Sequence, residues 1–426
     1  DGRSVDFSGL ERQDGDSEAF RFSGYVKETL PEQRPCWITW TGQGLKAVVQ
    51  QNLEKSALYG GIISGQGPRY CPSIEDKVSR FPEAERHQVF LEPEGLETEE
   101  MYVNGLSTSL PPEVQQKFIE TIPGLENAVI TKMGYAVEYD YFPPHQLRHT
   151  LEVKKFPGLY FAGQINGTTG YEEAAGQGLM AGANAAIKIL GEEPLVLERH
   201  QAYIGVLVDD LVTKGVDEPY RLFTSRAEFR LRLRQDNAHR RLGPLAGRIG
   251  LLTEGQRAAL QAREEQHDAV KGWFKKTSIR PEQLNPALRE LGIDEIKKAA
   301  KASSLLKRPG VSAECLAMAG KAPFRRGQEM DALAAVEMEI KYQGYVDMEE
   351  ERVKALNKQG DFKLHSLLPY EEFGTLSIEA REKLARVRPS SLAQAGRIPG
   401  VSPADLQNLI MEVRRHRTPQ QSKAKG

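Results

Sequence analysis

The chain has 426 residues, of which 39% are hydrophobic and 27% are charged, a composition typical of a globular protein with two or three domains. No apolar run reaches the roughly 18 residues of a membrane-spanning helix, and the N-terminus lacks the pattern of a secretory signal. The net charge of −2 gives no support to nucleic-acid binding as such, although a chain of this total charge can still carry a basic face.

The three cysteines, Cys36, Cys71 and Cys315, have no paired spacing and no histidine cluster nearby. This pattern argues against a disulfide framework and against a zinc site, so we predict no metal and a reducing, cytoplasmic compartment. Alternating residues at 34–41 predict a strand that contains Cys36, which we interpret as structural. The apolar spacing in residues 44–60 then predicts a helix of about four turns.

The next informative segment, residues 67–81, reads GPRYCPSIEDKVSRF. Two prolines restrict the loop that holds Cys71, and the guanidinium of Arg69 favours the thiolate, the nucleophilic form of cysteine. A lone cysteine is more often a small buried apolar residue, so the residues alone favour a structural role. The charged residues that follow are Glu75, Asp76, Lys77 and Arg80. Their spacing alone favours a solvated face over a dinucleotide site.

Turn residues separate short apolar runs in the region that follows. Residues 89–91 predict a strand, and Asn104-Gly105 predicts a tight hairpin turn. Residues 134–144 alternate as a strand and stop at paired prolines. We interpret His145 and His149, which come next, as surface or packing residues, because no acidic partner pattern accompanies them.

The chain is organised around residues 158–190. Residues 159–161 predict a buried parallel strand, which leads through a loop rich in glycine and threonine into a helix from Tyr171. Such a unit presents backbone amides and the positive helix end to an electron-rich ligand. Glycine inside a helix costs about 1 kcal/mol relative to alanine, so we expect the sheet or a cofactor to lie close. The helix glycines are Gly176, Gly178 and Gly182.

The string AGQINGTTGYEEAAGQGL at 162–179, with RYCPSIEDKV at 69–78, closely resembles the GidA/MnmG flavoenzymes, which modify the wobble uridine of tRNA. More generally, the strand–helix element resembles that of glutathione-reductase-type flavoproteins, with Gln164 where most of them carry aspartate. Such proteins need an N-terminal G-x-G-x-x-G turn, and none occurs before Gly158. We therefore expect an N-terminally truncated chain.

The resemblance implies roles for particular residues. Cys71 is implied to be catalytic, and four residues are implied to face the active-site cleft: Glu92, Glu94, Asn104 and Ser107. The implied FAD-binding residues are Gly163, Gln164, Gly170, Tyr171, Glu172 and Glu173. The implied NADH-binding residues are Gly67, Pro68, Arg69, Tyr70, Ser73, Glu75, Asp76, Lys77 and Arg80.

Composition changes after Pro194. Residues 196–243 predict a helix, a connector through Gly215 and a strongly basic helix with interleaved aromatic residues. Arginines beside aromatic rings suit RNA, whose phosphates bind guanidinium and whose unpaired bases stack. A salt-bridged helix, with Glu228 and Asp236 as partners, fits equally well, and the resemblance favours the RNA interpretation. The predicted RNA-binding residues here are Arg226, Arg230, Arg234 and Arg240.

Successive helices are predicted from Thr253 onward. Residues 398–403 read IPGVSP between two helices and resemble a helix–hairpin–helix turn, whose free amides can hold a phosphate. Arg414 and Arg415 add positive charge to the tail, so one hypothesis is contact with tRNA or a partner protein. The alternative is a packed turn between two helices.

The predicted fold is the C-terminal part of a glutathione-reductase-type α/β FAD domain with a mixed α/β insertion, followed by an all-helical domain. We expect an insertion with the NADH and substrate side at 1–150, the FAD-domain strand and helix at 151–196, and a helical tRNA- and partner-binding domain at 197–426.

The resemblance implies an enzyme that forms 5-carboxymethylaminomethyluridine at the wobble position. It implies FAD, NADH, methylenetetrahydrofolate, and glycine or ammonium, and a homodimer that acts with a tRNA-modification GTPase. Two alternatives stay open: a folate- and FAD-dependent tRNA uracil methyltransferase, and a non-catalytic RNA-binding fragment. About 200 helical residues after Leu197 count against the methyltransferase.

Overall fold

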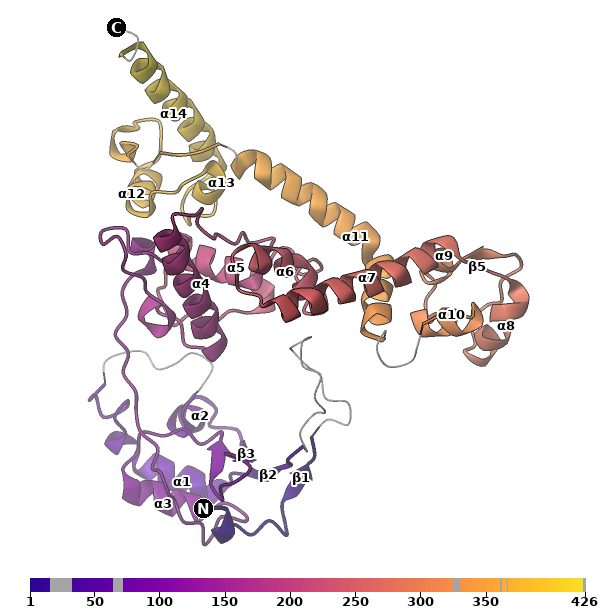
Figure 1. Cartoon of the computed structure of the whole chain (residues 1–426). Coiled ribbons are helices and arrows are strands. Elements are labelled where there is room, and N and C mark those ends of the chain that lie inside the picture. Colours follow the sequence, from indigo (N-terminus) through magenta and orange to yellow (C-terminus); the bar gives the residue numbers. More distant parts are fainter. Residues whose placement is uncertain (16–32, 64–71, 325–329, 361, 366, 424–426) are drawn as a thin grey trace. The chain divides into compact units, whose positions relative to one another are not determined.

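The computed structural model describes residues 1–15, 33–63, 72–324, 330–360, 362–365 and 367–423. The chain forms two compact units (Figure 1). Unit 1 comprises residues 1–142, 163–171 and 216–221, and unit 2 comprises residues 143–162, 172–215 and 222–426. In the part of the chain that the structure describes, no helix combines the length and apolar character needed to cross a membrane.

Unit 1 contains an antiparallel four-stranded sheet in the order β1-β2-β3-β4. The strands are β1 (Glu11–Gln13), β2 (Cys36–Trp40), β3 (Gln88–Pro93) and β4 (Met101–Asn104). The strands predicted at 34–41 and 89–91 are confirmed, and they pair with each other, with Trp37 opposite Leu91. Alternation along β3 turns Val89 and Leu91 into the core, as expected for a sheet with one buried face.

Three helices complete the core of unit 1. They are α1 (Gln43–Gln51), α2 (Ile74–Arg80) and α3 (Pro112–Ile119). Their apolar side chains form one cluster with those of β3. The helix predicted over residues 44–60 ends earlier and continues only as a 3-10 turn at Leu53–Lys55. The Asn52 side chain donates to the carbonyl of Val48 (2.8 Å), which competes with continuation of the helix at this point.

Two local predictions for unit 1 are wrong. Residues 134–144 form no strand, because alternation yields a strand only where a neighbouring strand pairs with it, and no described strand does so. Asn104-Gly105 is not the hairpin turn, because β3 and β4 are joined by residues 94–100. Gly105 instead ends β4 with φ of 100°, a conformation that favours glycine.

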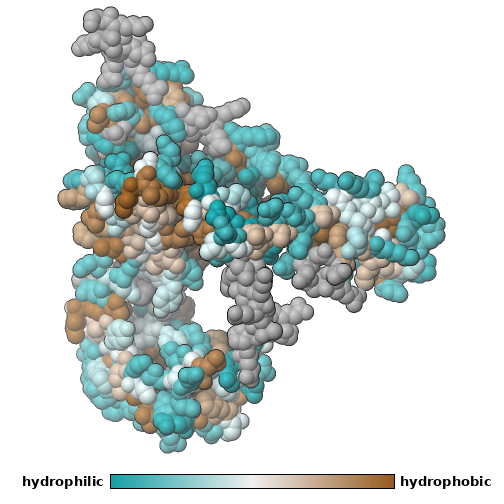
Figure 2. Space-filling model, in the orientation of Figure 1, coloured by the Kyte–Doolittle hydropathy of each residue, from teal (hydrophilic) through white to brown (hydrophobic). Residues whose placement is uncertain are grey.

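Unit 2 opens with a short irregular region. The parallel strand predicted at 159–161 is wrong: only an isolated antiparallel bridge joins Tyr160 to Glu152, since no parallel strand lies beside it among the described residues. The predicted helix is confirmed as α4 (Tyr171–Leu190), which buries Met180 and other apolar residues in a core of unit 2. On the surface of this region hydrophobic side chains gather around α4 (Figure 2).

The segment predicted as helix, connector and basic helix is only partly helical. Its first helix is α5 (Tyr203–Asp209), which continues as the π-helix η5 (Asp210–Lys214) and stops at Gly215 with φ of 76°. The prediction of a basic helix is wrong up to residue 237. In its place a 3-10 turn, η6 (Thr224–Arg226), and irregular turns precede α6 (Ala238–Arg248). Tertiary contacts override local propensity here, because the carbonyl of Arg226 accepts from the buried Arg199 (3.0 Å).

Helices dominate the remainder, as predicted. They are α7 (Glu254–Lys276), α8 (Pro281–Glu290), α9 (Ala302–Leu305), α10 (Ala313–Ala319), α11 (Met330–Gly360), α12 (Ile378–Val387), α13 (Leu392–Ala395) and α14 (Pro403–Lys423) (Figure 1). Thr253 and Gln256 form a capping box that starts α7. One two-stranded pair, β5 (Ser278–Ile279) and β6 (Ala300–Lys301), departs from the all-helical prediction. The mixed α/β part followed by a helical region confirms the predicted fold class.

A helix–turn–helix module occurs twice in the helical part. The first copy is α9–α10, with the sequence PGVS at 309–312, and the second is α13–α14, with PGVS at 399–402. Both turns place their glycine at positive φ, 79° for Gly310 and 89° for Gly400. Both serines cap the following helix. The two copies lie in separate apolar cores, so the duplication is one of structure as well as sequence.

Candidate functional site

The glycine loop before α4, predicted to hold flavin, has a defined conformation in unit 1. Gly163 has φ of 84° and starts the 3-10 turn η4 (Gly163–Asn166), in which Gln164 is exposed. Tyr220 holds the loop from the side: its amide donates to the carbonyl of Gly167 (2.9 Å), and its carbonyl accepts from Thr169 (3.1 Å). The loop therefore depends on a segment about 50 residues away in sequence.

One face of α4 is bare. An added Cβ at Gly178 or Gly182 would meet no atom within 4 Å, whereas one at Gly176 would lie 3.3 Å from Ile204. A close neighbour is thus present at Gly176, but it is a residue of α5 and not the predicted sheet or cofactor, and the other two glycines leave open space beside the helix within the described residues. Exposed apolar residues continue this face toward the helix end, including Ile189.

The start of α4 divides the predicted flavin residues into two kinds. Tyr171, which is 94% exposed, and Glu172 point to solvent. Glu173 is buried, and its carboxylate accepts from the amide of Leu222 (2.7 Å). Glu173 thus stabilises the fold after Gly215, a role that its sequence position did not indicate.

Most of the predicted NADH-binding residues that the structure describes form hydrogen bonds that cap α2 or attach it to neighbouring segments. Ser73 caps α2 by accepting from the amide of Asp76 (3.2 Å). Glu75 is fully buried and accepts from the amide (2.8 Å) and hydroxyl (3.0 Å) of Ser109. The ammonium of Lys77 donates to the carbonyl of Gly105 (2.7 Å).

Arg80 lies 3.4 Å from Asp76 at the surface. Five predicted residues lie outside the described part of the chain: Gly67, Pro68, Arg69, Tyr70 and Cys71.

The predicted substrate-side residues lie in unit 1. Asn104 donates to the carboxylate of Glu92 (3.1 Å) across the β3–β4 pair. Ser107 uses its carbonyl to accept from the amide of Ile74 (2.7 Å). Burial raises the pKa of Cys36, and the charge of Glu92 adds to this rise. The Cys36 thiol therefore stays protonated at neutral pH, in agreement with a structural role.

The four arginines predicted to bind RNA differ in their surroundings. Arg234 pairs with Asp236 (2.9 Å). Arg240 contacts Glu264 (2.7 Å) and Glu339 (2.6 Å), so both of these arginines fit the salt-bridged alternative. Arg226 is half-buried, and its carbonyl accepts from Arg199. Arg230 is exposed and has no hydrogen-bond or ion-pair partner among the described residues.

A buried ionic cluster that we did not predict lies in unit 2. Arg199, which is 7% exposed, contacts Asp209 (3.2 Å), Asp210 (2.7 Å) and Glu228 (2.9 Å). Arg397 closes the cluster by a two-pronged contact with Asp209 (2.7 and 2.8 Å). The sequence did carry one indication of this cluster, because Asp209 and Asp210 lie in an otherwise apolar helix. Carboxylates in such a position are buried only when positive charges pair with them.

His149 joins this cluster. Its Nε2 lies 3.2 Å from Oδ1 of Asp209, so the prediction that this histidine has no acidic partner is wrong. The partner is 60 residues away, beyond the reach of local pattern reading. His145 has no such partner, and burial, with Arg386 and Lys154, lowers its pKa.

The helix–hairpin–helix turn does not offer the free amides that we predicted. Asp405 accepts from the amides of Ser402 (3.0 Å) and Ser377 (2.8 Å). The ion pair of Glu379 with Lys383 lies against Gly400 and fills the space beside the turn. The turn therefore fits the packed alternative, while Arg414 and Arg415 on α14 are exposed.

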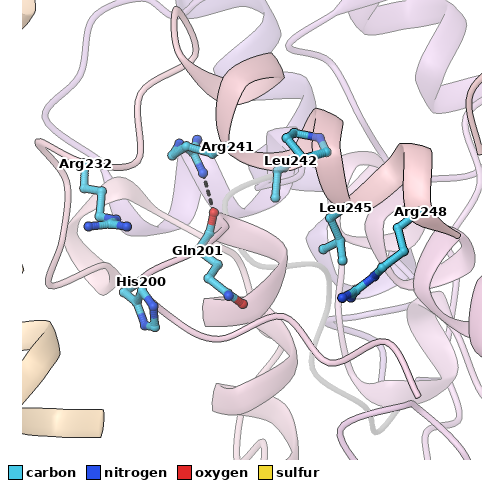
Figure 3. Close-up of a pocket in the computed structure, with 8 residues that line it drawn as sticks. His200, Gln201, Arg232, Arg241, Leu242, Leu245 and Arg248 are labelled. Carbon is cyan, nitrogen blue, oxygen red and sulfur yellow. Dashed lines mark hydrogen bonds between the residues drawn. The ribbon is translucent and has the colours of Figure 1, made fainter. Parts of the chain in front are cut away.

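A cavity of about 560 Å³ lies next to α6 (Figure 3). Its lining residues are His200, Gln201, Arg232, Arg241, Leu242, Pro244, Leu245 and Arg248, and we call it the arginine pocket. Figure 3 shows Arg241, Leu242, Leu245 and Arg248 arriving from α6, with His200 and Arg232 on the other side. Three of these residues carry a positive charge at every physiological pH.

Comparison with known proteins gives consistent results along the chain. Family models match as "Glucose inhibited division protein A" at residues 1–193, and as the "tRNA modifying enzyme MnmG/GidA" C-terminal helical domain at 254–350 and C-terminal helical bundle at 352–426. Two crystal structures of Aquifex aeolicus GidA match with TM-scores of 0.82 at 41% and 43% identity; they cover 96% and 97% of this chain, which covers 65% and 66% of theirs.

Curated relatives named "tRNA uridine 5-carboxymethylaminomethyl modification enzyme MnmG" are similar over nearly the whole chain. Identity is 49% with the protein from Bacillus licheniformis and 46% with that from Flavobacterium psychrophilum, each over 96% of this chain. The chain spans 65% of the first relative's length and 67% of the second's. It therefore belongs to the GidA/MnmG family of tRNA-modifying enzymes.

Proposed function

We propose that this protein takes part in forming 5-carboxymethylaminomethyluridine at the wobble position of tRNA. The observation that carries the proposal is the identity of 46–49% with curated MnmG proteins across 96% of the chain. Identity of this extent covers the glycine loop, α4 and the helical region together. A tRNA substrate is proposed in line with the relatives' names, and a cytoplasmic location is part of the same proposal.

FAD is the proposed redox cofactor, and the residues beside α4 fit such a group. The bare face at Gly178 and Gly182 gives a flat ring room to approach the backbone. In unit 1, Gly163, the exposed Gln164, Gly170 and Tyr171 are proposed flavin contacts in their own right, and Glu172 is a further proposed contact. The bound flavin would supply electron transfer. Glu173 would act indirectly, by holding Leu222.

We further propose that Cys71 assists chemistry at carbon 5 of the uridine, with NADH as reductant bound near residues 67–80. Methylenetetrahydrofolate would be the one-carbon source, and glycine or ammonium would supply nitrogen. Because Glu75 and Lys77 hold the α2 region together, any NADH contact is more readily made by Arg80 and the exposed surface near it.

The helical part, residues 197–426, is the proposed contact surface for tRNA, for a GTPase partner and for a second copy. Arg230 is the best candidate among the predicted arginines, since it is exposed and not engaged in an ion pair within the described residues. Arg226, Arg414 and Arg415 remain proposed contacts. Arg234 and Arg240 are proposed to stabilise the fold through their ion pairs and not to contact RNA.

Disrupting the gene for this protein should remove 5-carboxymethylaminomethyl nucleosides from wobble position 34 of the tRNAs that carry them. Mass analysis of purified tRNA measures this directly, and a plasmid copy of the gene should restore them. Loss of 5-methyluridine instead would support the methyltransferase alternative. Unchanged nucleosides would contradict both enzymatic activities and leave the non-catalytic alternative.

Filling the bare face of α4 should prevent flavin binding without harming the fold. Gly178→Leu should lower the flavin absorbance of protein isolated from its natural gene by more than half, because the new side chain enters open space that the ring needs. Gly272→Leu, on α7, is the matched control, since it too has nothing within 4 Å. Both variants should keep or slightly raise the melting temperature, because glycine costs about 1 kcal/mol in a helix. Full flavin content in Gly178→Leu would contradict the proposed site.

A further inference from the structure

We propose that the arginine pocket binds one phosphate of the tRNA chain together with its nucleoside. The proposal rests on the tRNA substrate proposed above and specifies where one nucleotide is held. The pocket lies wholly in unit 2, on residues that are not among the predicted RNA-binding arginines. It combines cationic groups, an unused donor and an apolar wall, which together match a nucleoside phosphate and not a bare ion.

Two of the three arginines in the pocket, Arg241 and Arg248, have no ion-pair partner among the described residues, and the third, Arg232, has a loose pair with Glu350 (3.7 Å). Arg248, at the end of α6, has no hydrogen-bond partner there either. The hydrogen bonds that Arg241 donates within the described residues go to neutral oxygens, those of Asn237 (2.7 Å), Arg234 (3.2 Å) and Gln201. Burial, with the nearby charges of Arg232 and Arg234, lowers the pKa of Arg241. An anion bound beside these arginines would reduce the repulsion between their like charges.

Arg232 has a donor still to be used. Its Nε is buried and makes no hydrogen bond within the described residues. The nearest carboxylate oxygen to its NH1 is that of Glu350 at 3.7 Å, beyond hydrogen-bond distance. The Nε is closed to solvent, so a phosphate oxygen would first meet the exposed part of the guanidinium, on a side chain that is 32% exposed. Guanidinium groups bind phosphate oxygens in pairs, which suits a phosphate at this arginine.

The other walls suit the remainder of a nucleotide. Leu242, Pro244 and Leu245 give an apolar surface along α6, and the ring of His200 faces them from before α5. The Nδ1 of His200 lies 3.2 Å from Glu198, and the ring, whose side chain is 14% exposed, packs edge-on against Phe229, so only its part in the pocket wall could contact a base. A cavity of about 560 Å³ exceeds what a phosphate alone would fill.

Backbone contacts hold the site in place before ligand arrives. The guanidinium of Arg241 is fixed by two carbonyls and an amide oxygen, so little side-chain freedom is lost on binding. The amide of Arg232 donates to Glu349 on α11 (3.0 Å), which fixes that side of the pocket. Arg248 is the exposed member and therefore the one that can be changed without disturbing these bonds.

Arg248→Gln tests the proposal with Arg257→Gln as its control. Arg257 is an exposed arginine on α7 without a partner among the described residues, and it does not line the pocket. Filter binding of unmodified tRNA to the full protein should weaken by about 10-fold in Arg248→Gln. The slope of log affinity against log salt should fall by about one, the loss of one phosphate contact. Arg257→Gln should change neither quantity.

Adenosine monophosphate distinguishes a free nucleotide from an RNA nucleotide. We expect tRNA binding to depend on Arg248 and free AMP to compete only at millimolar concentration. AMP affinity that depends on Arg248, with tRNA affinity unchanged, would overturn the proposal in favour of a free nucleotide. Equal tRNA binding by both variants would also overturn it. Weakened binding in Arg248→Gln, with wobble nucleosides unchanged after gene disruption, would instead refute only the proposed reaction.

Discussion

Asp209→Asn should lower the free energy of unfolding by about 3 kcal/mol, because it removes one partner of a buried ion pair and leaves positive charge behind. Asp209 is 3% exposed and contacts Arg199, Arg397 and His149. Burial alone would raise the pKa of Asp209, but the hydrogen bond from His149 and the charge of Arg397 lower it. The carboxylate is therefore charged in the folded protein at neutral pH.

Urea unfolding at pH 7 measures this effect. Glu295→Gln is the control, since the Arg289–Glu295 pair (2.9 Å) is exposed at both ends and should contribute less than about 1 kcal/mol. The double variant Asp209→Asn, Arg397→Gln should be less destabilised than the two single variants added together, because the two side chains contact each other. Strict additivity, or an effect no larger than that of the control, would contradict a coupled cluster.

Acid should weaken a second ionic centre, at Glu339. Burial alone would raise the pKa of Glu339, but hydrogen bonds from His267 and Lys271 lower it from 4.5 to about 2. A lowered folded-state pKa means that the stabilisation is complete above pH 4.5 and is lost as pH falls toward 2. The shift corresponds to about 3 kcal/mol.

The difference between wild type and Glu339→Gln isolates this contribution from the other carboxylates. Denaturant unfolding at several pH values should show the wild type more stable above pH 4.5, with the gap closing by about 3 kcal/mol on acidification to pH 2. Glu264→Gln, at an exposed partner of the same Arg240, should lower the free energy of unfolding at pH 7 by less than Glu339→Gln does. A gap that does not change with pH would show that Glu339 is not held in its charged form.

Local patterns in the sequence predicted the elements whose signals are themselves local. Alternation predicted β2, a short apolar run predicted β3, and the helical period predicted α4 and the later helices. Residues 134–144 alternate as well, but no strand in the described part of the chain pairs with them. Periodicity can be read from a single segment, whereas a strand forms only when a second segment pairs with the first.

The candidate site shows the same limit. The glycine loop and the family resemblance could be read from residues 158–190. The ion pairs of the arginines could not be predicted from the sequence, because Arg240 contacts Glu339 and Arg199 contacts Asp209 only once the chain has folded. Likewise, Arg232, Arg241 and Arg248 gather in one pocket although their spacing follows no known motif. The repeated PGVS was the one long-range signal open to direct reading.

The two helix–turn–helix copies differ at an equivalent position, two residues before the proline. The first copy has the exposed Lys307, and the second has Arg397, which grips Asp209. Through Asp209, Arg397 joins the second module to the segment around Arg199, whereas Lys307 makes no ion pair among the described residues. A similar turn therefore serves once as a surface turn and once as a link between distant segments of unit 2.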